Sequence, residues 1–555
     1  MNTWRLVSSG VAMGYDLVLV GGSVVDGSGR PAFRADVGVE GGMISEVGSI
    51  HPDEAGLTID ATGLVVAPGF IDMHSHSDIY LLVNPRAESK IRQGVTTEVV
   101  GNCGGSVAPA LGLARESIER RARSLGLEVD WSTFGEYLDR LDEGVAVNVA
   151  PLVGHGTVRS CVMDLEERAP TGGELEEMKG LIAEAMGDGA FGMSSGLVYP
   201  PGRYAGTEEL VELCRVVAEH GGVYASHIRG ERETMLQAVE EALAIGERSG
   251  VSVQISHHPA KIGAWGTSPR TLAMMEETSG RGIDVMCDLH PYIAGATGLS
   301  AILPPWAQAG GDERIVERLK DPEFREKMKE DMIEDRVPGP GHSGLAKRGM
   351  WDKILITNHT EDWPVGRTIA EIAEERGLDP FDAYFDLVEA SEAQGGILGF
   401  YYREEDIRNV LLSPRSVIGS DGSALAPYGV LGRGRNHPRS YGTFPMIFRK
   451  YVRGESRPEL VGDEGAAILS LEEAVKKMTS LPAGKLGISD RGLVESGCWA
   501  DLVVFDPDGV ADTATYLDPY RYPEGIVHVL VNGVPVIKSG EHTGALPGRA
   551  LRHRA

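Results

Sequence analysis

Eight apolar runs in the middle of this chain have the length of a β-strand, and each of them ends in a polar residue. In chain order they read LVVAPGFIDMHSH, TTEVVGN, VAVNVAPLVGH, AFGMSSG, GVYASH, VSVQISH, IDVMCDLH and SVIGSD. Helical stretches such as TEELVELCRVVAEH separate several of these runs. Continuous apolar strands followed by helices are typical of parallel β/α units, because helices cover both faces of a parallel sheet. Eight such units predict an α/β fold, a closed (β/α)8 barrel of the TIM type.

The polar residues at the ends of the runs are expected to meet, although they are far apart in the sequence. In a (β/α)8 barrel the carboxyl ends of all strands lie on one face, and this face holds the active site. The sequence therefore predicts one barrel mouth that is lined by polar side chains. They are His76, Asn102, His155, Ser194, Ser195, His227, His257, His290 and Asp421.

The two ends of the chain are rich in short β-type runs broken by Gly-Gly, Asp-Gly and Asn-Gly turns. Chain termini often lie close together, so these two segments are expected to pair into one small β-sandwich. The predicted domains are residues 1–66 for the first part of the sandwich, 67–480 for the barrel and 481–555 for the second part. The first residues, before the first β-run, are interpreted as a loose leader in which Met13 is a second candidate start.

A long segment separates the seventh and eighth runs and contains the charged stretch DERIVERLKDPEFREKMKEDMIEDR. It is too long for an ordinary βα loop, so residues 300–415 are predicted to form a helical insertion beside the mouth. Its charges are interpreted first as a solvated helix face. A lid over the substrate is the alternative.

Composition excludes several classes of protein. Of the 555 residues, 42% are hydrophobic, which is too many for a disordered chain. The formal net charge of −28 argues against nucleic acid as a partner, because a phosphate backbone would be repelled. No apolar run reaches the ~20 residues that a membrane span needs. Five scattered cysteines do not form a disulfide framework, so a reducing cytoplasm is predicted.

The strongest chemical signal is the motif PGFIDMHSH at residues 68–76. Alternate residues of a strand point the same way, so His74 and His76 face one side and can bind one divalent metal. Two surface histidines would produce the same spacing. Their place on the first strand of a barrel, directly after a β-rich segment, favours the metal site.

With this motif the sequence resembles the amidohydrolase superfamily, and within it the D-aminoacylase branch of N-acyl-D-amino-acid deacylases. The resemblance covers essentially the whole chain. It depends on QGVTTEVVGNCGGSVAP, PLVGHGTVR, SSGLVYPPG, YASHIRGE, QISHH, HPYIAGATGLS, IGSDG and HPRSYGTFP.

The resemblance implies a Zn²⁺ centre. Many amidohydrolases bridge two metals with a carboxylated lysine on the fourth strand, but FGMSSG offers no lysine, and Cys103 matches the cysteine that replaces it in this branch. A small buried cysteine is the structural alternative. The family pattern assigns a tight Zn²⁺ site to Cys103, His227 and His257. It assigns a weaker second site to His74, His76, Cys103 and Asp421.

The family also implies roles around the metal. Asp421 matches the general base and acid, although an aspartate that caps a loop before glycine would look the same. Arg439 matches the arginine that binds the substrate carboxylate, where its planar fork allows bidentate recognition. Tyr292 and Tyr199 match substrate-contacting tyrosines. Lys261 comes two residues later than the family lysine, since the sequence reads HHPAK, and this displacement puts its role in question.

Four further positions are interpreted with less specific roles. His258 follows His257 directly and is expected to point the other way on a regular strand, into the structure. Thr297 occupies the place of a substrate-binding serine. His155 and His290 face the predicted mouth without a role that the residues supply.

The resulting prediction is a zinc-dependent enzyme that hydrolyses N-acyl-D-amino acids, a small-molecule substrate, by a metal-activated hydroxide. The first alternative keeps the metal site and opens a cyclic amide, as in dihydropyrimidinase-like or hydantoinase-like relatives. The second is a non-catalytic barrel that only binds or scaffolds, which the complete ligand set disfavours. The sequence carries no prediction of oligomeric state.

Overall fold

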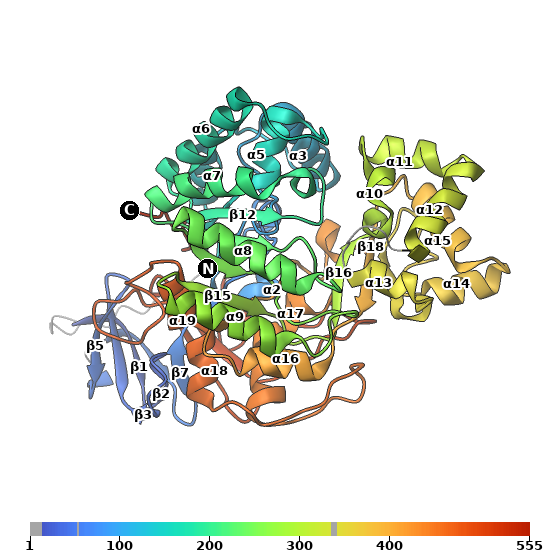
Figure 1. Cartoon of the computed structure of the whole chain (residues 1–555). Coiled ribbons are helices and arrows are strands. Elements are labelled where there is room, and N and C mark those ends of the chain that lie inside the picture. The colour runs from blue at the N-terminus through green and yellow to red at the C-terminus, as the bar shows by residue number, and fades with distance from the viewer. Residues whose placement is uncertain (1–13, 53–54, 335–340, 555) are drawn as a thin grey trace.

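The structure is a computed structural model that describes residues 14–52, 55–334 and 341–554. The expected leader and the candidate start at Met13 lie outside the described residues. Figure 1 shows a central barrel region, with the N-terminal strands on one side and helices α10–α15 on the other.

Each of the eight apolar runs contains a parallel strand that is almost wholly buried, as expected for strands covered on both faces. They are β8 (Phe70–Asp72), β9 (Val95–Val100), β10 (Asn148–Pro151), β12 (Gly192–Gly196), β13 (Val223–His227), β14 (Ser252–Ile255), β15 (Val285–Leu289) and β19 (Ser416–Ile418).

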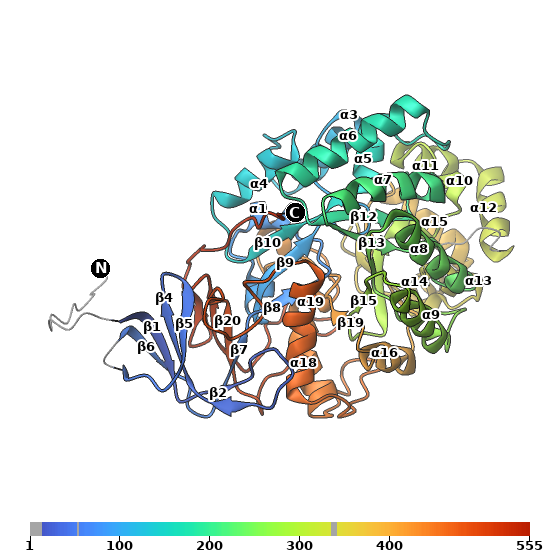
Figure 2. The same cartoon turned by 60° about the vertical axis from the view of Figure 1, so that its left-hand side comes forward.

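The strands follow the order of a TIM-type barrel, but their hydrogen-bonded ladders form two sheets (Figure 2). One sheet has the order β10-β9-β8, and the other has the order β11-β12-β13-β14-β15-β19, where β11 is Val153–Gly154. The break lies between β10 and β11, where Pro151 has no N–H to donate to a ladder. At the other side, Met73 N donates to Ile418 O at 3.4 Å and brings the first strand beside the last. The hydrogen-bonded ladders therefore do not form the single closed sheet that the sequence predicts.

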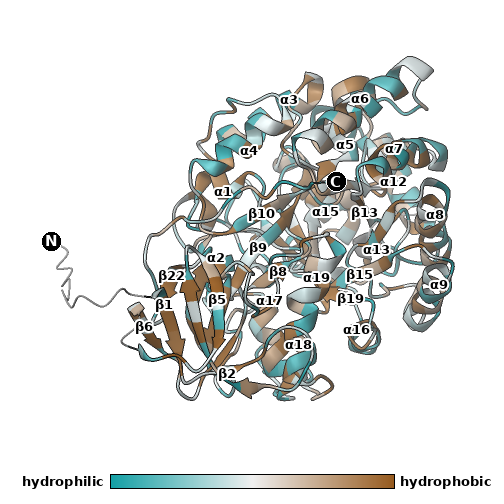
Figure 3. Cartoon of the chain, turned by 90° about the vertical axis from the view of Figure 1, so that its left-hand side faces the viewer, coloured by the Kyte–Doolittle hydropathy of each residue, from teal (hydrophilic) through white to brown (hydrophobic). Residues whose placement is uncertain are grey.

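Helices cover the outside of these strands (Figure 2). Their apolar faces turn inward: α7, for example, buries Leu210, Leu213 and Val217. Strand β1 is largely hydrophobic, whereas helices such as α4 and α6 carry hydrophobic and hydrophilic residues together (Figure 3). The helices are α1 (Tyr80–Val83), α2 (Glu88–Ile91), α3 (Gly112–Ser124), α4 (Phe134–Asp142), α5 (His155–Met163), α6 (Gly172–Asp188), α7 (Thr207–Glu219), α8 (Met235–Ser249), α9 (Ser268–Gly280), α16 (Glu404–Leu411), α17 (Arg439–Met446), α18 (Leu471–Met478) and α19 (Ser480–Lys485).

Strands from the two chain ends lie in one sheet. A seven-stranded sheet joins β23 (Glu541–His542), β22 (Val534–Lys538), β21 (Ile526–Val531) and β20 (Leu502–Phe505) to β7 (Val65–Pro68), β2 (Ser23–Val24) and β3 (Phe33–Arg34). A four-stranded sheet contains β5 (Met43–Gly48), β4 (Asp36–Glu40), β1 (Tyr15–Val20) and β6 (Ala55–Asp60). One buried cluster takes side chains from both sheets, among them Leu17, Val39, Leu502 and Leu530.

The first apolar run divides between these sheets and the barrel, which the sequence did not predict. Residues 65–68 form β7, and the chain then turns at Gly69 into barrel strand β8. A Cβ at Gly69 would approach the side chain of Thr96 to 2.2 Å, so only glycine fits between the two strands.

The insertion is not wholly helical. It contains α10 (Pro305–Gln308), α11 (Asp312–Leu319), α12 (Pro322–Glu334), α13 (Gly341–Lys347), α14 (Ile369–Arg376) and α15 (Pro380–Ala390). Two strands of this segment, β18 (Gly396–Phe400) and β17 (Ile354–Asn358), form an antiparallel sheet with β16 (Ala294–Gly298), which lies just before residue 300; the order is β16-β18-β17. The glycine-rich segments AGATG and GILGF have no alternating apolar pattern, so no strand is predicted there from sequence. Among the described residues, no helix has both the length and the apolar content that a bilayer crossing requires.

Candidate metal centre and active site

The six predicted metal ligands gather at the mouth of the barrel, just beyond the ends of five strands. His74 and His76 follow β8, Cys103 follows β9 and His227 ends β13. His257 and Asp421 follow β14 and β19. The potential ligand atoms of the cysteine and the four histidines form two groups that share Cys103: His74 with His76, and His227 with His257.

Short distances connect the members of each group. His74 Nε2 lies 3.3 Å from Cys103 Sγ, and His76 Nε2 lies 3.0 Å from Asp421 Oδ1. On the other side of the thiol, His257 Nε2 is 3.6 Å from Cys103 Sγ and 2.9 Å from His227 Nδ1. Imidazole, thiolate and carboxylate are the donors that Zn²⁺ prefers, so this cluster fits zinc by its chemistry.

Three of these residues have a backbone conformation that L-amino acids rarely adopt. The φ angles are +53° at Cys103, +35° at His257 and +50° at Asp421. Such positions cost of order 1 kcal/mol and cluster at functional sites, where the surrounding structure fixes them. The same turn holds Gly101, at which a Cβ would approach Leu152 O to 2.0 Å. The turns that aim these side chains into the mouth are thus tightly constrained.

The site holds two groups as anions. Burial alone would raise the pKa of the Cys103 thiol, but His74, His227 and His257 hold it well below its usual range. Burial would also raise the pKa of Asp421, and Arg439 together with His76 holds it well below its usual range. A thiolate and a carboxylate therefore face the histidines, and their negative charge would stabilise a cation bound among them.

Asp288, on β15, was not predicted as a site residue. Its Oδ1 lies 3.1 Å from His74 Nδ1 and accepts a hydrogen bond from His257 N at 2.8 Å, and its Oδ2 accepts one from Gln254 Nε2. With Nδ1–H of His74 directed at this carboxylate, Nε2 is left facing Cys103. A carboxylate on the far nitrogen is the usual support of a metal-binding histidine. The sequence feature that could have pointed to Asp288 is a carboxylate inside the otherwise apolar run IDVMCDLH.

A buried ion-pair network lies beneath the cluster. Lys90 Nζ is 2.6 Å from Asp72 Oδ2, 2.8 Å from Ser420 Oγ and 3.2 Å from Glu98 Oε2. Asp72 Oδ1 also accepts a hydrogen bond from Ser420 N at 2.7 Å. The network therefore connects the end of β8 to the residue that precedes Asp421.

A cavity of about 890 Å³ opens over the cluster and contains most of the predicted substrate-binding residues. Arg439 Nη1 donates to Asp421 Oδ2 at 2.6 Å. Tyr199 Oη lies 3.4 Å from Thr297 Oγ1. Lys261 forms an ion pair with Glu231, a second residue that was not predicted. The site thus places one cation, Arg439, directly beside the proposed base.

Four predicted or discussed residues lie elsewhere. Tyr292 is buried outside the lining of this cavity, with its hydroxyl donating to Pro438 O at 3.4 Å. His258 points away from the mouth, as expected, and its Nε2 lies 2.8 Å from Thr271 Oγ1 on α9. His155 contacts Glu209 through Nε2 at 2.9 Å. His290 is buried against the rings of Tyr402 and His437.

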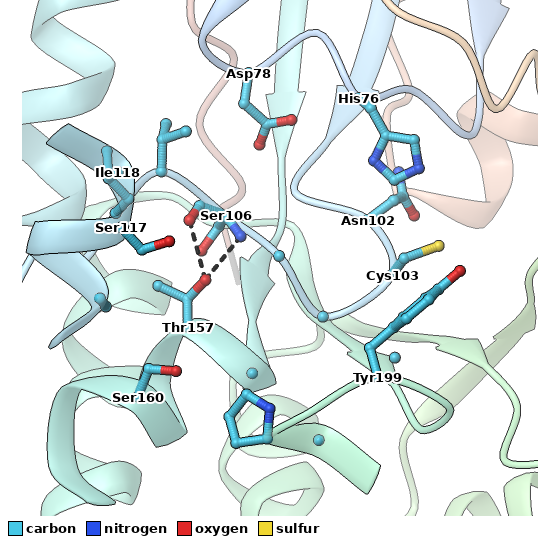
Figure 4. Close-up of a pocket in the computed structure, with 18 of the residues that line it drawn as sticks. His76, Asp78, Asn102, Cys103, Ser106, Ser117, Ile118, Thr157, Ser160 and Tyr199 are labelled. Atoms are coloured by element: carbon cyan, nitrogen blue, oxygen red, sulfur yellow. Dashed lines mark hydrogen bonds between the residues drawn. The ribbon is translucent and has the colours of Figure 1, made fainter. Parts of the chain in front are cut away.

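A second, smaller cavity of about 380 Å³ adjoins the first at His76, Cys103 and Tyr199 (Figure 4). It extends from the metal cluster between α3 and α5, and its lining includes Asp78, Ser106 and Thr157. The ligand cluster therefore stands at the junction of two cavities.

The sequence of this chain matches the model of the amidohydrolase family over residues 57–318 and 440–537. The chain belongs to the amidohydrolase family. It is 39% identical to D-aminoacylase of Alcaligenes xylosoxydans xylosoxydans over 98% of both chains. It is 36% identical to N-acyl-D-glutamate deacylase of the same organism over 97% of both chains.

A solved structure agrees with these sequence relationships. N-acyl-D-glutamate deacylase from Bordetella bronchiseptica, complexed with zinc and a phosphonate inhibitor that mimics the tetrahedral intermediate, aligns with a TM-score of 0.79. It is 34% identical and covers 97% of this amidohydrolase and 99% of its own chain. The prediction of a D-aminoacylase-like amidohydrolase with a TIM-type fold is confirmed at this level.

Proposed function

We propose that this amidohydrolase hydrolyses the amide bond of N-acyl-D-amino acids and releases a carboxylate and a free D-amino acid. The observation that carries the proposal is the cluster of Cys103, four histidines and Asp421 beside Arg439, in a chain similar to D-aminoacylase along its whole length. The D configuration of the substrate is taken from the relatives. All of the relatives described above act on linear N-acyl amino acids by name, which gives no support to the cyclic-amide alternative.

Zinc is the metal that we propose for the cluster. Cys103, His227 and His257 would hold one ion tightly, and His74, His76, Cys103 and Asp421 would hold a second ion more weakly. A zinc ion in such a site polarises an amide carbonyl and lowers the pKa of a water molecule to about 7.

Asp421 is the proposed general base and acid. Its carboxylate would take a proton from the attacking water and give it to the leaving nitrogen. His76 at Oδ1 and Arg439 at Oδ2 fix the orientation of the carboxylate. Its low pKa keeps it ionised and able to accept that proton.

Arg439 would bind the α-carboxylate of the substrate. Only Nη1 of its guanidinium is engaged by Asp421, so the other N–H groups are available for a second carboxylate. Tyr199, Lys261 and Thr297 line the same cavity and would contact the amino-acid part. Tyr292, which bonds to the carbonyl of Pro438, would hold the segment that carries Arg439.

The finer architecture is proposed on the same basis. The eight strands would close into one barrel within the span of residues 67–480, beginning after β7 ends at Pro68. The terminal segments 1–66 and 481–555 would make one β-sandwich, to which the last residues of β7 also belong. The shared buried cluster of the two terminal sheets supports this division. All five cysteines are free, which supports the proposed cytoplasmic location.

The test is turnover of a panel of N-acetyl-D-amino acids against the matching L set, with zinc-loaded enzyme. We expect hydrolysis of D substrates only, and Asp421→Ala should abolish turnover while mass spectrometry still finds zinc at the tight site. Equal activity on both sets, faster opening of hydantoin or dihydrouracil, or an unchanged rate in Asp421→Ala would overturn the proposal.

A further inference from the structure

The smaller cavity gives this enzyme a second binding compartment next to the reacting bond. The residues that line both cavities are His76, Cys103, Ser117, Arg121 and Tyr199. Arg439 and Lys261 line only the larger cavity. An amide held at the shared residues would therefore direct one substituent into each cavity. If the proposed function is correct, the α-carboxylate lies with Arg439, and the acyl group is left for the smaller cavity.

We call this smaller cavity the acyl pocket and define it by His76, Asp78, Ser106, Ile118, Thr157 and Ser160 (Figure 4). Its volume of about 380 Å³ far exceeds what the methyl group of an acetyl substituent fills. Its walls combine apolar side chains such as Ile118 with polar ones such as Ser106 and Thr157. Ser106 and Thr157 are hydrogen-bonded to each other, since Ser106 N donates to Thr157 Oγ1 at 2.9 Å and Thr157 Oγ1 donates to Ser106 O at 3.0 Å.

Asp78 is the decisive wall residue. It is 7% exposed, and Figure 4 shows its carboxylate directed toward the space between His76 and Ser106. Backbone N–H groups of Asp78 and Gly101 approach the carboxylate. No hydrogen bond or ion pair connects it to a side chain among the described residues. The charges of His76 and Arg121, which line the same cavity, act on it. A buried carboxylate has several acceptor sites, so it has capacity for a further donor.

We propose that the acyl pocket selects acyl groups that carry a hydrogen-bond donor, a hydroxyl or an amino group, and that Asp78 accepts this hydrogen bond. A plain hydrocarbon acyl chain would remove water from the carboxylate without replacing its hydrogen bonds, which is unfavourable. A hydroxyacyl or aminoacyl chain of the same length replaces them. The substrate class is therefore a polar N-acyl-D-amino acid.

The test uses three isosteric acyl groups on one amino acid: N-pentanoyl-, N-(4-hydroxybutanoyl)- and N-(4-aminobutanoyl)-D-leucine, with N-acetyl-D-leucine as reference. We expect kcat/KM about tenfold higher for at least one of the two donor-bearing substrates than for the pentanoyl substrate. A binding readout accompanies it: 4-hydroxybutanoate should inhibit hydrolysis of N-acetyl-D-leucine at a lower concentration than pentanoate, by a similar factor.

Three variants test whether the preference for donor-bearing acyl groups arises from Asp78 and the acyl pocket. Asp78→Asn should reduce the preference for the donor-bearing groups to less than about threefold. Ser160→Leu, which narrows the acyl pocket from α5, should lower the ratio of pentanoyl to acetyl turnover. Asp164→Asn removes the same charge from the exposed end of α5, outside the acyl pocket, and should keep the wild-type preference.

Equal turnover of the three isosteres by the wild-type enzyme, or an unchanged preference in Asp78→Asn, would overturn the acyl pocket while N-acetyl-D-leucine is still hydrolysed. Absence of hydrolysis of every D substrate would instead overturn the proposed function. If Asp78→Asn does not fold, the Ser160→Leu ratio and the inhibition by the two acids still decide the question.

Discussion

At the scale of single residues, the metal centre depends on side chains that are not themselves ligands. Asp288 receives hydrogen bonds from the ring of His74 and from the backbone of His257, so one carboxylate orients residues of both ligand groups. The sequence does not show this role. In the sheet, β15 lies between β14, which precedes His257, and β19, which precedes Asp421.

Asp288→Asn should weaken zinc binding about 10- to 100-fold, the usual effect of losing a carboxylate that supports a metal-bound histidine. The measurement is competition for zinc against a chromogenic chelator. Asp284→Asn is the matched control, since Asp284 lies just before the same strand and bonds to Lys485 instead of to the site. Equal affinities of the two variants would contradict this role for Asp288.

At the scale of elements, the first and last barrel strands are held together mainly by side chains near the metal centre. Backbone contact between them is limited to the Met73–Ile418 hydrogen bond and its neighbours around Ser75 and Gly422. Lys90 of α2 contacts both strand ends, through an ion pair with Asp72 and a hydrogen bond to Ser420. Lys90 and Asp72 are fully buried, so each charge depends on the other.

Lys90→Met should lower the free energy of unfolding by about 3–5 kcal/mol, because it leaves the carboxylates of Asp72 and Glu98 buried without their cation. Urea unfolding followed by circular dichroism measures this change. Lys353→Met is the control: Lys353 is half exposed and pairs with Asp352 at the surface, so its loss should cost less than about 1 kcal/mol. A small effect at Lys90 would show that the two strand ends do not need the ion pair.

At the scale of the whole molecule, the ligand cluster connects five strand ends that are distant in the sequence. The pKa values of two of its members, Cys103 and Asp421, lie well below their usual ranges, and three members have positive φ angles. A bound cation would therefore stabilise the folded barrel as a whole, because the unfolded chain does not present these ligands together.

Removal of metal with a strong chelator should lower the thermal midpoint of unfolding by about 5 °C or more, and stoichiometric Zn²⁺ should restore both the midpoint and activity. Differential scanning calorimetry with parallel assays is the measurement. Mg²⁺ should not restore the midpoint, since a thiolate is a poor ligand for it. Unchanged midpoints after complete metal removal would contradict the structural contribution of the cluster.

The sequence by itself determined the order of the eight barrel strands, the pairing of the two chain ends and the six candidate ligands. The strand order and the pairing depend on local signals, the apolar runs and the turn residues. His74 and His76 follow from the HxH spacing, whereas Cys103, His227, His257 and Asp421 were assigned through the resemblance to the amidohydrolase superfamily. Gly69 shows the limit of such signals, since one continuous run holds strands of two different sheets.

Only the tertiary structure determined which residues hold the metal-site side chains in place and how the two cavities are shaped. Asp288, Glu231, Asp78 and the Lys90 network act through contacts between segments that are distant in the chain, and no local pattern encodes such contacts. Tyr292 is the opposite case. The family resemblance implied that it contacts the substrate, but its hydroxyl donates to Pro438 O and it does not line the cavity. Composition and spacing report what a residue is, whereas burial and distance to other strands determine what it can touch.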